Sequence, residues 1–126
     1  MGWIGLIIIA AVYIGYVFGT RWMQKRYLTT LEETVFRGGY RKAQLIDVRE
    51  PDQFKSGHIL GARNIPLTQL KMRQLEIRHD MPIYLYDNNG NGSARAASVL
   101  KRLGYRNLFQ LKGGFKKWQG RVKSDS

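Results

Sequence analysis

One stretch near the N-terminus limits what this chain can be. Residues 2–19 read GWIGLIIIAAVYIGYVFG and contain no charged side chain. A helix of about 20 apolar residues spans the hydrocarbon of a bilayer. Trp3 lies at one end of the stretch, and Tyr16 and Trp22 lie towards the other, as expected for aromatic residues at two membrane interfaces. We therefore expect residues 2–19 to contact the lipid bilayer as a single transmembrane helix.

Two other interpretations fit this stretch less well. A cleavable signal peptide begins with basic residues and ends at a small-x-small site, and the sequence has neither. A helix in the core of a globular domain is seldom apolar on every side. Arg21, Lys25 and Arg26 follow the stretch directly, and basic flanks stay on the cytoplasmic side. The predicted topology has the N-terminus outside and residues 21–126 in the cytoplasm.

Composition limits the rest of the chain. The 126 residues leave room for one globular domain. With 21 Lys and Arg against 9 Asp and Glu, the net charge is +12, which predicts an anionic neighbour. For an anchored domain we expect this neighbour to be an anionic lipid surface. We expect no nucleic acid, because RNA-binding sheets expose aromatic side chains on an open face, whereas the sheet predicted below is covered on both faces. There is no cysteine, so the sequence offers no disulfide, thiolate metal site or thiol nucleophile.

Hydrophobic runs alternate with helical segments after residue 29. The runs 43–48, 63–65, 83–86 and 107–111 predict strands, and the segments 30–37, 67–79 and 94–103 predict helices. Thr30 and Glu33 have the spacing of a capping box for the first of these helices. This alternation predicts a parallel α/β sheet. We divide the chain into an anchor (1–20), a basic neck (21–29), one domain (30–120) and a basic, polar tail (121–126).

The loop after the predicted strand 83–86 has an unusual composition. Glycine and asparagine tolerate positive φ, so the loop can turn sharply, and Ser93 is a good N-cap for the helix behind it. A tight loop between a strand and a helix N-terminus forms a concave anion site lined with backbone N–H groups. Asp87 ends the strand and already supplies a negative charge there. The expected active loop consists of Asp87, Asn88, Asn89, Gly90, Asn91, Gly92 and Ser93.

Other polar residues are expected at the same edge of the sheet, because ligands of parallel sheets bind beyond the carboxyl ends of the strands. Asp47 and Arg49 follow the strand 43–48, and Arg95 lies just behind the loop. We expect these three residues to form its rim, with Arg49 paired to a local carboxylate. Asp47 and Asp87 could share a cation, but two carboxylates are only half of a metal site. We therefore predict no metal and no cofactor.

Two groups of motifs resemble the rhodanese family. The segments Leu45-Ile-Asp-Val-Arg-Glu-Pro-Asp-Gln-Phe54 and Gly57-His-Ile-Leu-Gly-Ala-Arg-Asn-Ile-Pro66 resemble its N-terminal signature. The segments 93–97, 103–105 and 111–118 resemble its C-terminal half. The resemblance covers roughly residues 27–120 and is specific, because several motifs occur in the right order. It implies a single rhodanese-like domain: a five-stranded parallel sheet with helices on both faces, here preceded by the transmembrane helix.

The departures from the family pattern bear on function. The resemblance implies that the catalytic cysteine, which carries a persulfide, stands where this chain has Asp87, and that Gly92 stands where sulfurtransferases often have arginine. A carboxylate forms no stable persulfide. We therefore predict a domain without catalytic residues or sulfurtransferase chemistry that acts as a binding, scaffolding or regulatory module for a protein partner. The alternative is an enzyme with a non-thiol mechanism, such as metal-assisted phosphoester hydrolysis that uses Asp87.

Overall fold

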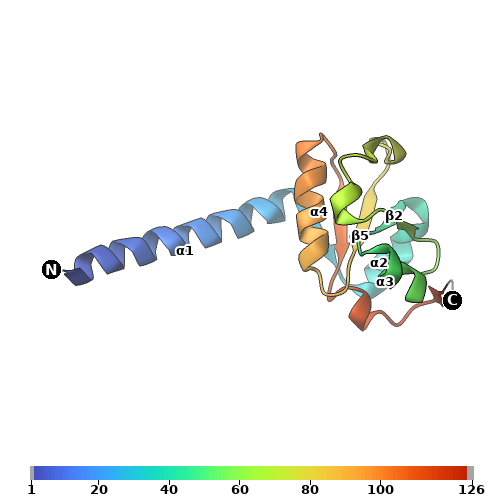
Figure 1. Ribbon diagram of the computed structural model, residues 1–126, viewed down its shortest axis with the longest axis horizontal. Coiled ribbons are helices and arrows are strands. Elements are labelled where there is room, and N and C mark those ends of the chain that lie inside the picture. Colours follow the sequence, from blue (N-terminus) through green and yellow to red (C-terminus); the bar gives the residue numbers. More distant parts are fainter. Residues whose placement is uncertain (1, 125–126) are drawn as a thin grey trace.

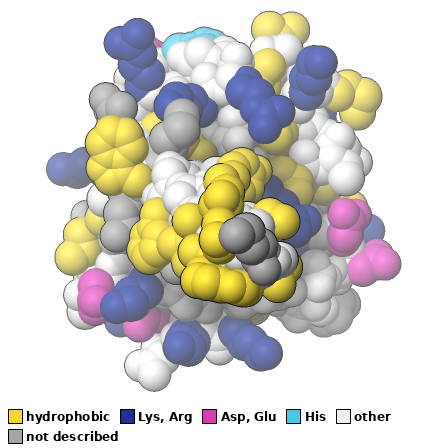
Figure 2. Space-filling model, turned by 90° about the vertical axis from the view of Figure 1, so that its left-hand side faces the viewer, with side chains coloured by type: hydrophobic (Ala, Val, Ile, Leu, Met, Phe, Trp, Pro, Cys, Tyr) yellow, Lys and Arg dark blue, Asp and Glu magenta, His cyan; other side chains and the backbone are white. Residues whose placement is uncertain are grey.

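The computed structural model describes residues 2–124, apart from the side chains of residues 21 and 23–26. Helix α1 runs from Gly2 to Tyr27 and projects from an α/β domain as a long rod (Figure 1). Its segment Gly2–Thr20 is long and apolar enough to cross a membrane, and none of it is buried. Seen along its axis, the rod is covered with hydrophobic side chains (Figure 2). The side chains of Arg21, Lys25 and Arg26, on which the predicted topology depends, lie outside the described residues.

The domain is built on a five-stranded parallel sheet with the strand order β1-β6-β5-β2-β4. The strands are β1 (Leu28–Leu31), β2 (Gln44–Asp47), β4 (Arg63–Asn64), β5 (Ile83–Tyr86) and β6 (Leu108–Leu111). The central strand β5 places Leu85 beside Ile46 of β2 and Gln110 of β6. A separate antiparallel pair joins β3 (His58–Ile59) to β7 (Val122–Lys123). The five-stranded parallel sheet predicted from the sequence is confirmed.

Helices cover both faces of this sheet (Figure 1). They are α2 (Glu33–Gly39), α3 (Pro51–Ser56) and α4 (Asn91–Arg102), with the 3₁₀ helices η1 (Tyr40–Lys42), η2 (Leu67–Gln69), η3 (Gln74–Glu76) and η4 (Phe115–Lys117). On one face, Leu100 of α4 packs in a cluster with Leu85. On the other, Phe36 of α2 packs with Leu45 and Tyr86. Because each fully buried side chain of this size contributes about 1.5–3 kcal/mol, these clusters stabilise the sheet from both sides.

The first part of the domain differs from the prediction. The capping box at Thr30 and Glu33 is wrong, because Thr30 lies in β1, where it pairs with Gln110 of β6. Glu32 precedes α2 instead, and the helix begins at Glu33. Sheet pairing over Leu28–Leu31 has overridden a local helix signal. The sheet therefore begins inside the segment 21–29 that the sequence suggests as a basic neck.

Two further segments differ from expectation. Residues 67–79 form the short helices η2 and η3 rather than one helix. Leu70 is fully buried while Leu75 is 98% exposed, so the apolar residues of this segment do not share one helical face. At the C-terminus, Val122 and Lys123 pair with β3. The polar tail expected at 121–126 thus contributes a strand, and its last two residues lie outside the described part of the chain.

Candidate functional site

The loop 87–93 lies at the carboxyl end of the central strand β5 and includes the first turn of α4. Gly90 precedes the helix with φ of 100°, a left-handed conformation that favours glycine. This turn starts α4 at Asn91, so the predicted capping role of Ser93 is wrong. Ser93 is buried in the first turn of the helix, and its hydroxyl oxygen lies 3.0 Å from the Gly90 carbonyl and 2.6 Å from Oε1 of Gln110.

The Asp87 carboxylate fills the concave side of this loop. The amide of Gly90 donates to its Oδ1 at 2.5 Å, and the amide of Gly92 donates to its Oδ2 at 2.6 Å. The residue is only 8% exposed. Amide groups at a helix N-terminus bind negative charge. The loop therefore holds an anion, as the sequence suggests, and that anion belongs to the chain itself.

Gly92 allows the carboxylate to occupy this position. A Cβ atom on Gly92 would lie 2.7 Å from Oδ2 of Asp87 and 3.2 Å from its carboxyl carbon. Real Cβ atoms do not approach other heavy atoms so closely, so a side chain here would push the carboxylate away from the two amides. In the present conformation of the loop, the Asp87 carboxylate and a side chain at position 92 exclude each other.

A second turn holds the loop from behind. The amide of Phe115 donates to the Asp87 carbonyl at 2.7 Å, and that of Lys116 donates to the Asn88 carbonyl at 3.1 Å. Gly114, with φ of 70°, makes this approach possible, because a Cβ there would lie 2.5 Å from the Asn88 carbonyl group. This turn was not predicted as part of the site. The signal for it was the pair Gly113-Gly114, since adjacent glycines often mark a close approach of two backbones.

The rim contains a buried ion pair. Arg49 donates from Nε and Nη2 to the carboxylate of Asp47, with Nη2–Oδ2 at 2.7 Å, so Arg49 pairs with a local carboxylate as predicted. Its Nη1 reaches Oδ1 of Asn88 at 3.2 Å, and its guanidinium lies over the Phe115 ring at 4.4 Å from the centroid. Arg49 therefore connects the end of β2 to the active loop. Arg95, the third residue predicted for the rim, is exposed on α4.

The two carboxylates of the site have separate partners. Both oxygens of Asp47 accept hydrogen bonds from Arg49, and both oxygens of Asp87 accept them from the loop. Within the described residues, no group of three or more His, Asp or Glu side chains could hold a metal ion. Charge-assisted bonds of this kind are among the stronger polar contacts in proteins, so both carboxylates act here as structural anions.

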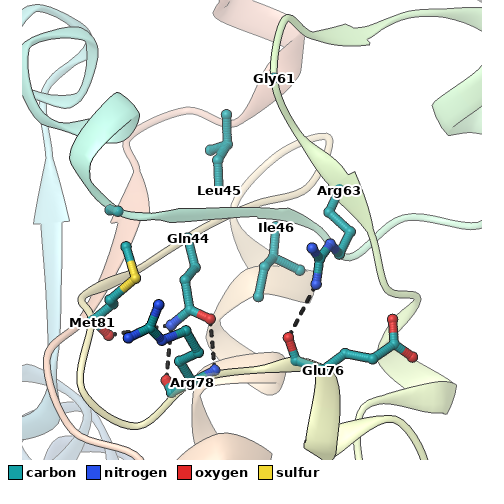
Figure 3. Close-up of a pocket in the computed structure, with 9 residues that line it drawn as sticks. Gln44, Leu45, Ile46, Gly61, Arg63, Glu76, Arg78 and Met81 are labelled. Carbon is teal, nitrogen blue, oxygen red and sulfur yellow. Dashed lines mark hydrogen bonds between the residues drawn. The ribbon is translucent and has the colours of Figure 1, made fainter.

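A pocket of about 290 Å³ opens at the other end of β2 and contains no residue of the loop (Figure 3). The side-chain amide of Gln44 lines this pocket. It donates to the backbone carbonyl of Arg78 at 2.8 Å and accepts from the backbone N–H of Arg78 at 2.7 Å. Arg63 donates to the Glu76 carbonyl at 3.1 Å. Arg78 is also paired with Asp80, and this hydrogen bond lowers the pKa of the Asp80 carboxyl. These polar groups hold the segment before β5 against β2.

The model of the rhodanese-like domain family matches residues 29–121. The chain belongs to the rhodanese-like family. Its curated relatives include the uncharacterized protein YqhL of Bacillus subtilis (strain 168), which is 56% identical over 119 residues that cover 94% of each protein.

Solved rhodanese-like structures have the same fold. A rhodanese-related protein from Thermoplasma volcanium is 26% identical with a TM-score of 0.69, and the match covers 75% of this chain and 97% of that one. The thiosulfate sulfurtransferase from Pseudomonas aeruginosa is 31% identical with a TM-score of 0.67 over 77% of this chain and 20% of that one. The rhodanese-like domain described here differs from the family pattern at the end of its central strand, where Asp87 stands and where the chain has no thiol.

Proposed function

We propose that this chain is a membrane-anchored rhodanese-like domain that has no sulfurtransferase activity and acts as a binding, scaffolding or regulatory module. The main support is the contact between the Asp87 carboxylate and the amides of Gly90 and Gly92, at 2.5 and 2.6 Å. These two amides converge on one anion at the start of α4. Since Asp87 occupies them, the loop has neither a nucleophile for sulfur nor a free anion site.

The chemistry of sulfur transfer supports the same proposal. A thiolate attacks the sulfane sulfur of the donor and keeps it as a persulfide. The Asp87 carboxylate is a poor nucleophile towards sulfur, and the sequence contains no cysteine to replace it. Phosphoester hydrolysis through Asp87 would need this carboxylate to leave its two amide donors. No contact of the described residues favours that alternative over a module without catalysis.

Helix α1 supports the membrane part of the proposal. Its segment Gly2–Thr20 is apolar, and none of it is buried. It corresponds to the anchor (1–20) in the proposed division of the chain, which continues with the neck (21–29), the rhodanese-like domain (30–120) and the tail (121–126). The basic residues that follow the span in the sequence support a topology with residues 21–126 in the cytoplasm and the N-terminus outside. A module held in this way presents its domain to protein partners at the inner face of the membrane.

A sulfur-transfer assay on the full chain in detergent micelles tests the proposal. The parent protein is expected to transfer no sulfur from thiosulfate to cyanide above background. Asp87→Cys places a thiol at the end of β5, and the double variant Asp87→Cys, Gly92→Arg adds a cation in the space that the carboxylate leaves. Gain of turnover in the double variant would show that the assay can detect activity in this scaffold. Turnover by the parent that survives repurification would overturn the proposal.

A further inference from the structure

A groove of about 570 Å³ lies where helix α1 meets the domain. It is lined by the end of α1, the start of β1, the last turn of α4 and the loop that leads into β6. Its lining includes Tyr27, Lys101 and Arg106. Helix α4 is on the side of the domain from which α1 projects (Figure 1). Viewed along α1, Lys and Arg side chains surround the base of the apolar rod (Figure 2). The groove therefore faces the side on which a membrane would lie.

The groove contains two cations. Lys101 and Arg106 are both exposed, and neither forms an ion pair with an acidic residue in the described part of the chain. The ammonium of Lys101 lies over the Tyr27 ring, 4.4 Å from its centroid, a cation–π contact that directs the charge towards the end of α1. A tyrosine at this place suits the boundary between lipid and water. The charge of the groove therefore fits an anionic group at a membrane interface.

The length of α1 determines how far the groove lies from the hydrocarbon of the membrane. The apolar segment has 19 residues, which at 1.5 Å per residue span about 28 Å, close to the roughly 30 Å of bilayer hydrocarbon. Tyr27 is the last residue of α1 and lies about 10 Å beyond Thr20 along the axis. The headgroup layer is roughly 5–8 Å thick on each side. Tyr27 and the cations beside it thus lie at the outer boundary of the headgroups, within about one Debye length of lipid phosphate.

We propose that this groove binds the phosphate-bearing headgroup of an anionic phospholipid, with Lys101 and Arg106 as its cationic contacts, and so docks the domain against the bilayer. The inference rests on the proposed membrane anchor. Lysine and arginine both donate charge-assisted hydrogen bonds to phosphate oxygens. Docking at this point adds a second attachment beside α1, which fixes the orientation of the domain on the membrane.

The test uses the full chain in nanodiscs. Because the sequence has no cysteine, Ser98→Cys, one turn from Lys101 on α4 and outside the groove, accepts a single fluorophore. A lipid with a nitroxide on its headgroup quenches a docked label, and fluorescence lifetimes separate docked from undocked molecules. We expect a higher docked-to-undocked ratio in discs that contain phosphatidylglycerol than in pure phosphatidylcholine. Added salt should lower that ratio in the parent protein.

Matched variants locate the contact. Lys101→Gln with Arg106→Gln should lower the docked-to-undocked ratio about fivefold for each charge removed. Arg41→Gln with Lys42→Gln removes the same charge from exposed positions in η1 and should leave the ratio unchanged. The inference would be overturned if the docked-to-undocked ratio did not depend on phosphatidylglycerol, or if it fell equally in the two double variants.

Two further results separate the possible failures. A chain that does not co-purify with the discs would overturn the anchor itself, and with it the docking. Inorganic phosphate that binds in neutral discs and abolishes the effect of phosphatidylglycerol would show a site for small anions and would overturn the assignment to lipid. Insertion into all discs, together with docking that depends on the anionic lipid and resists inorganic phosphate, is the result that the inference predicts.

Discussion

The amide nitrogen of Gly92 lies 2.6 Å from Oδ2 of Asp87, and a Cβ atom on Gly92 would lie 2.7 Å from the same oxygen. The amide of Gly92 therefore donates a hydrogen bond to the carboxylate, and the lack of a side chain at position 92 leaves room for the carboxylate oxygen. The two departures from the family pattern, at positions 87 and 92, are in this way one structural feature. A carboxylate at the end of β5 takes the space that the Cβ of an arginine, or of any other residue than glycine, would need at position 92.

The coupling between these positions predicts a non-additive pair of substitutions. Gly92→Ala should destabilise the parent by about 1–3 kcal/mol, because the new methyl group displaces the carboxylate. In the Asp87→Ala background the same change should cost much less, since the contacts with the carboxylate are gone, only the 3.3 Å contact between the two Cβ atoms remains, and alanine favours the helix. Urea unfolding of the full chain in micelles, followed by near-UV circular dichroism, measures all four proteins. A coupling energy below about 0.5 kcal/mol would contradict the exclusion of the two groups.

A neutral amide should replace Asp87 poorly. Asp87→Asn retains one oxygen for one of the amides of Gly90 and Gly92, but its NH₂ group then faces the other donor. An unpaired buried donor costs about 1–3 kcal/mol, and we expect the free energy of unfolding to fall by about that amount. Asp52→Asn, at an exposed site in the first turn of α3, is the control and should lose only a few tenths of a kcal/mol. Equal small losses in both variants would mean that the loop does not depend on the carboxylate.

Alkaline pH should destabilise the domain through a buried tyrosine. Burial raises the pKa of Tyr86 well above its ordinary value, and the negative charge of Asp47 raises it further. Above about pH 10 the unfolded state therefore loses this proton first, and stability falls by up to about 1.4 kcal/mol per pH unit for this group. Below about pH 10 the contribution is fully present.

Tyr86→Phe tests this pH dependence. Its free energy of unfolding should fall less steeply between about pH 10 and pH 11 than that of the parent. At neutral pH the variant should be less stable by about 1–3 kcal/mol, because the Ile59 amide, 3.0 Å from the Tyr86 hydroxyl, loses its acceptor. The same urea unfolding experiment, repeated across this pH range, gives both values. Parallel curves for parent and variant would show that Tyr86 does not titrate with unfolding.

The topology of the anchor predicts the side of the membrane on which the C-terminus lies. Because Arg21, Lys25 and Arg26 follow the span, a C-terminal fusion to a reporter that is active only outside the cytoplasm should be inactive. A fusion to a reporter active only in the cytoplasm is the matched positive control. Activity of the first reporter would reverse the orientation and would place the groove beside α1 at the other leaflet.

Much of the fold could be predicted because its central strands are short, buried and bounded by turn residues. The apolar runs that end at Asp47 and Asp87 predicted both strands and the edge of the sheet at which the two carboxylates lie. Thr30 could not be placed in the same way, because its strand exists only through pairing with β6. The separation of Leu70 from Leu75 into buried and exposed positions likewise depends on the packing of η2 and η3, which local periodicity does not encode.

The part of the site that depends on local sequence could be predicted, and the part that depends on tertiary packing could not. The composition of the loop indicated an inward-facing carboxylate with amide donors, but not the start of α4 at Asn91 or the bond between Ser93 and Gln110. That bond joins residues far apart in the sequence, so only the packing of α4 on β6 creates it. The backbone contact between Asn88 and Lys116 depends on tertiary structure in the same way.

An anion titration tests the central claim most directly. If the Asp87 carboxylate occupies the anion site of the loop, removing it should open the site. In Asp87→Ala, added sulfate is expected to shift the NMR amide signals of Gly90 and Gly92 in a saturable manner, while the same signals of the parent stay unchanged. Saturable shifts of equal size and midpoint in both proteins, or no response of these two amides in the variant, would contradict the account.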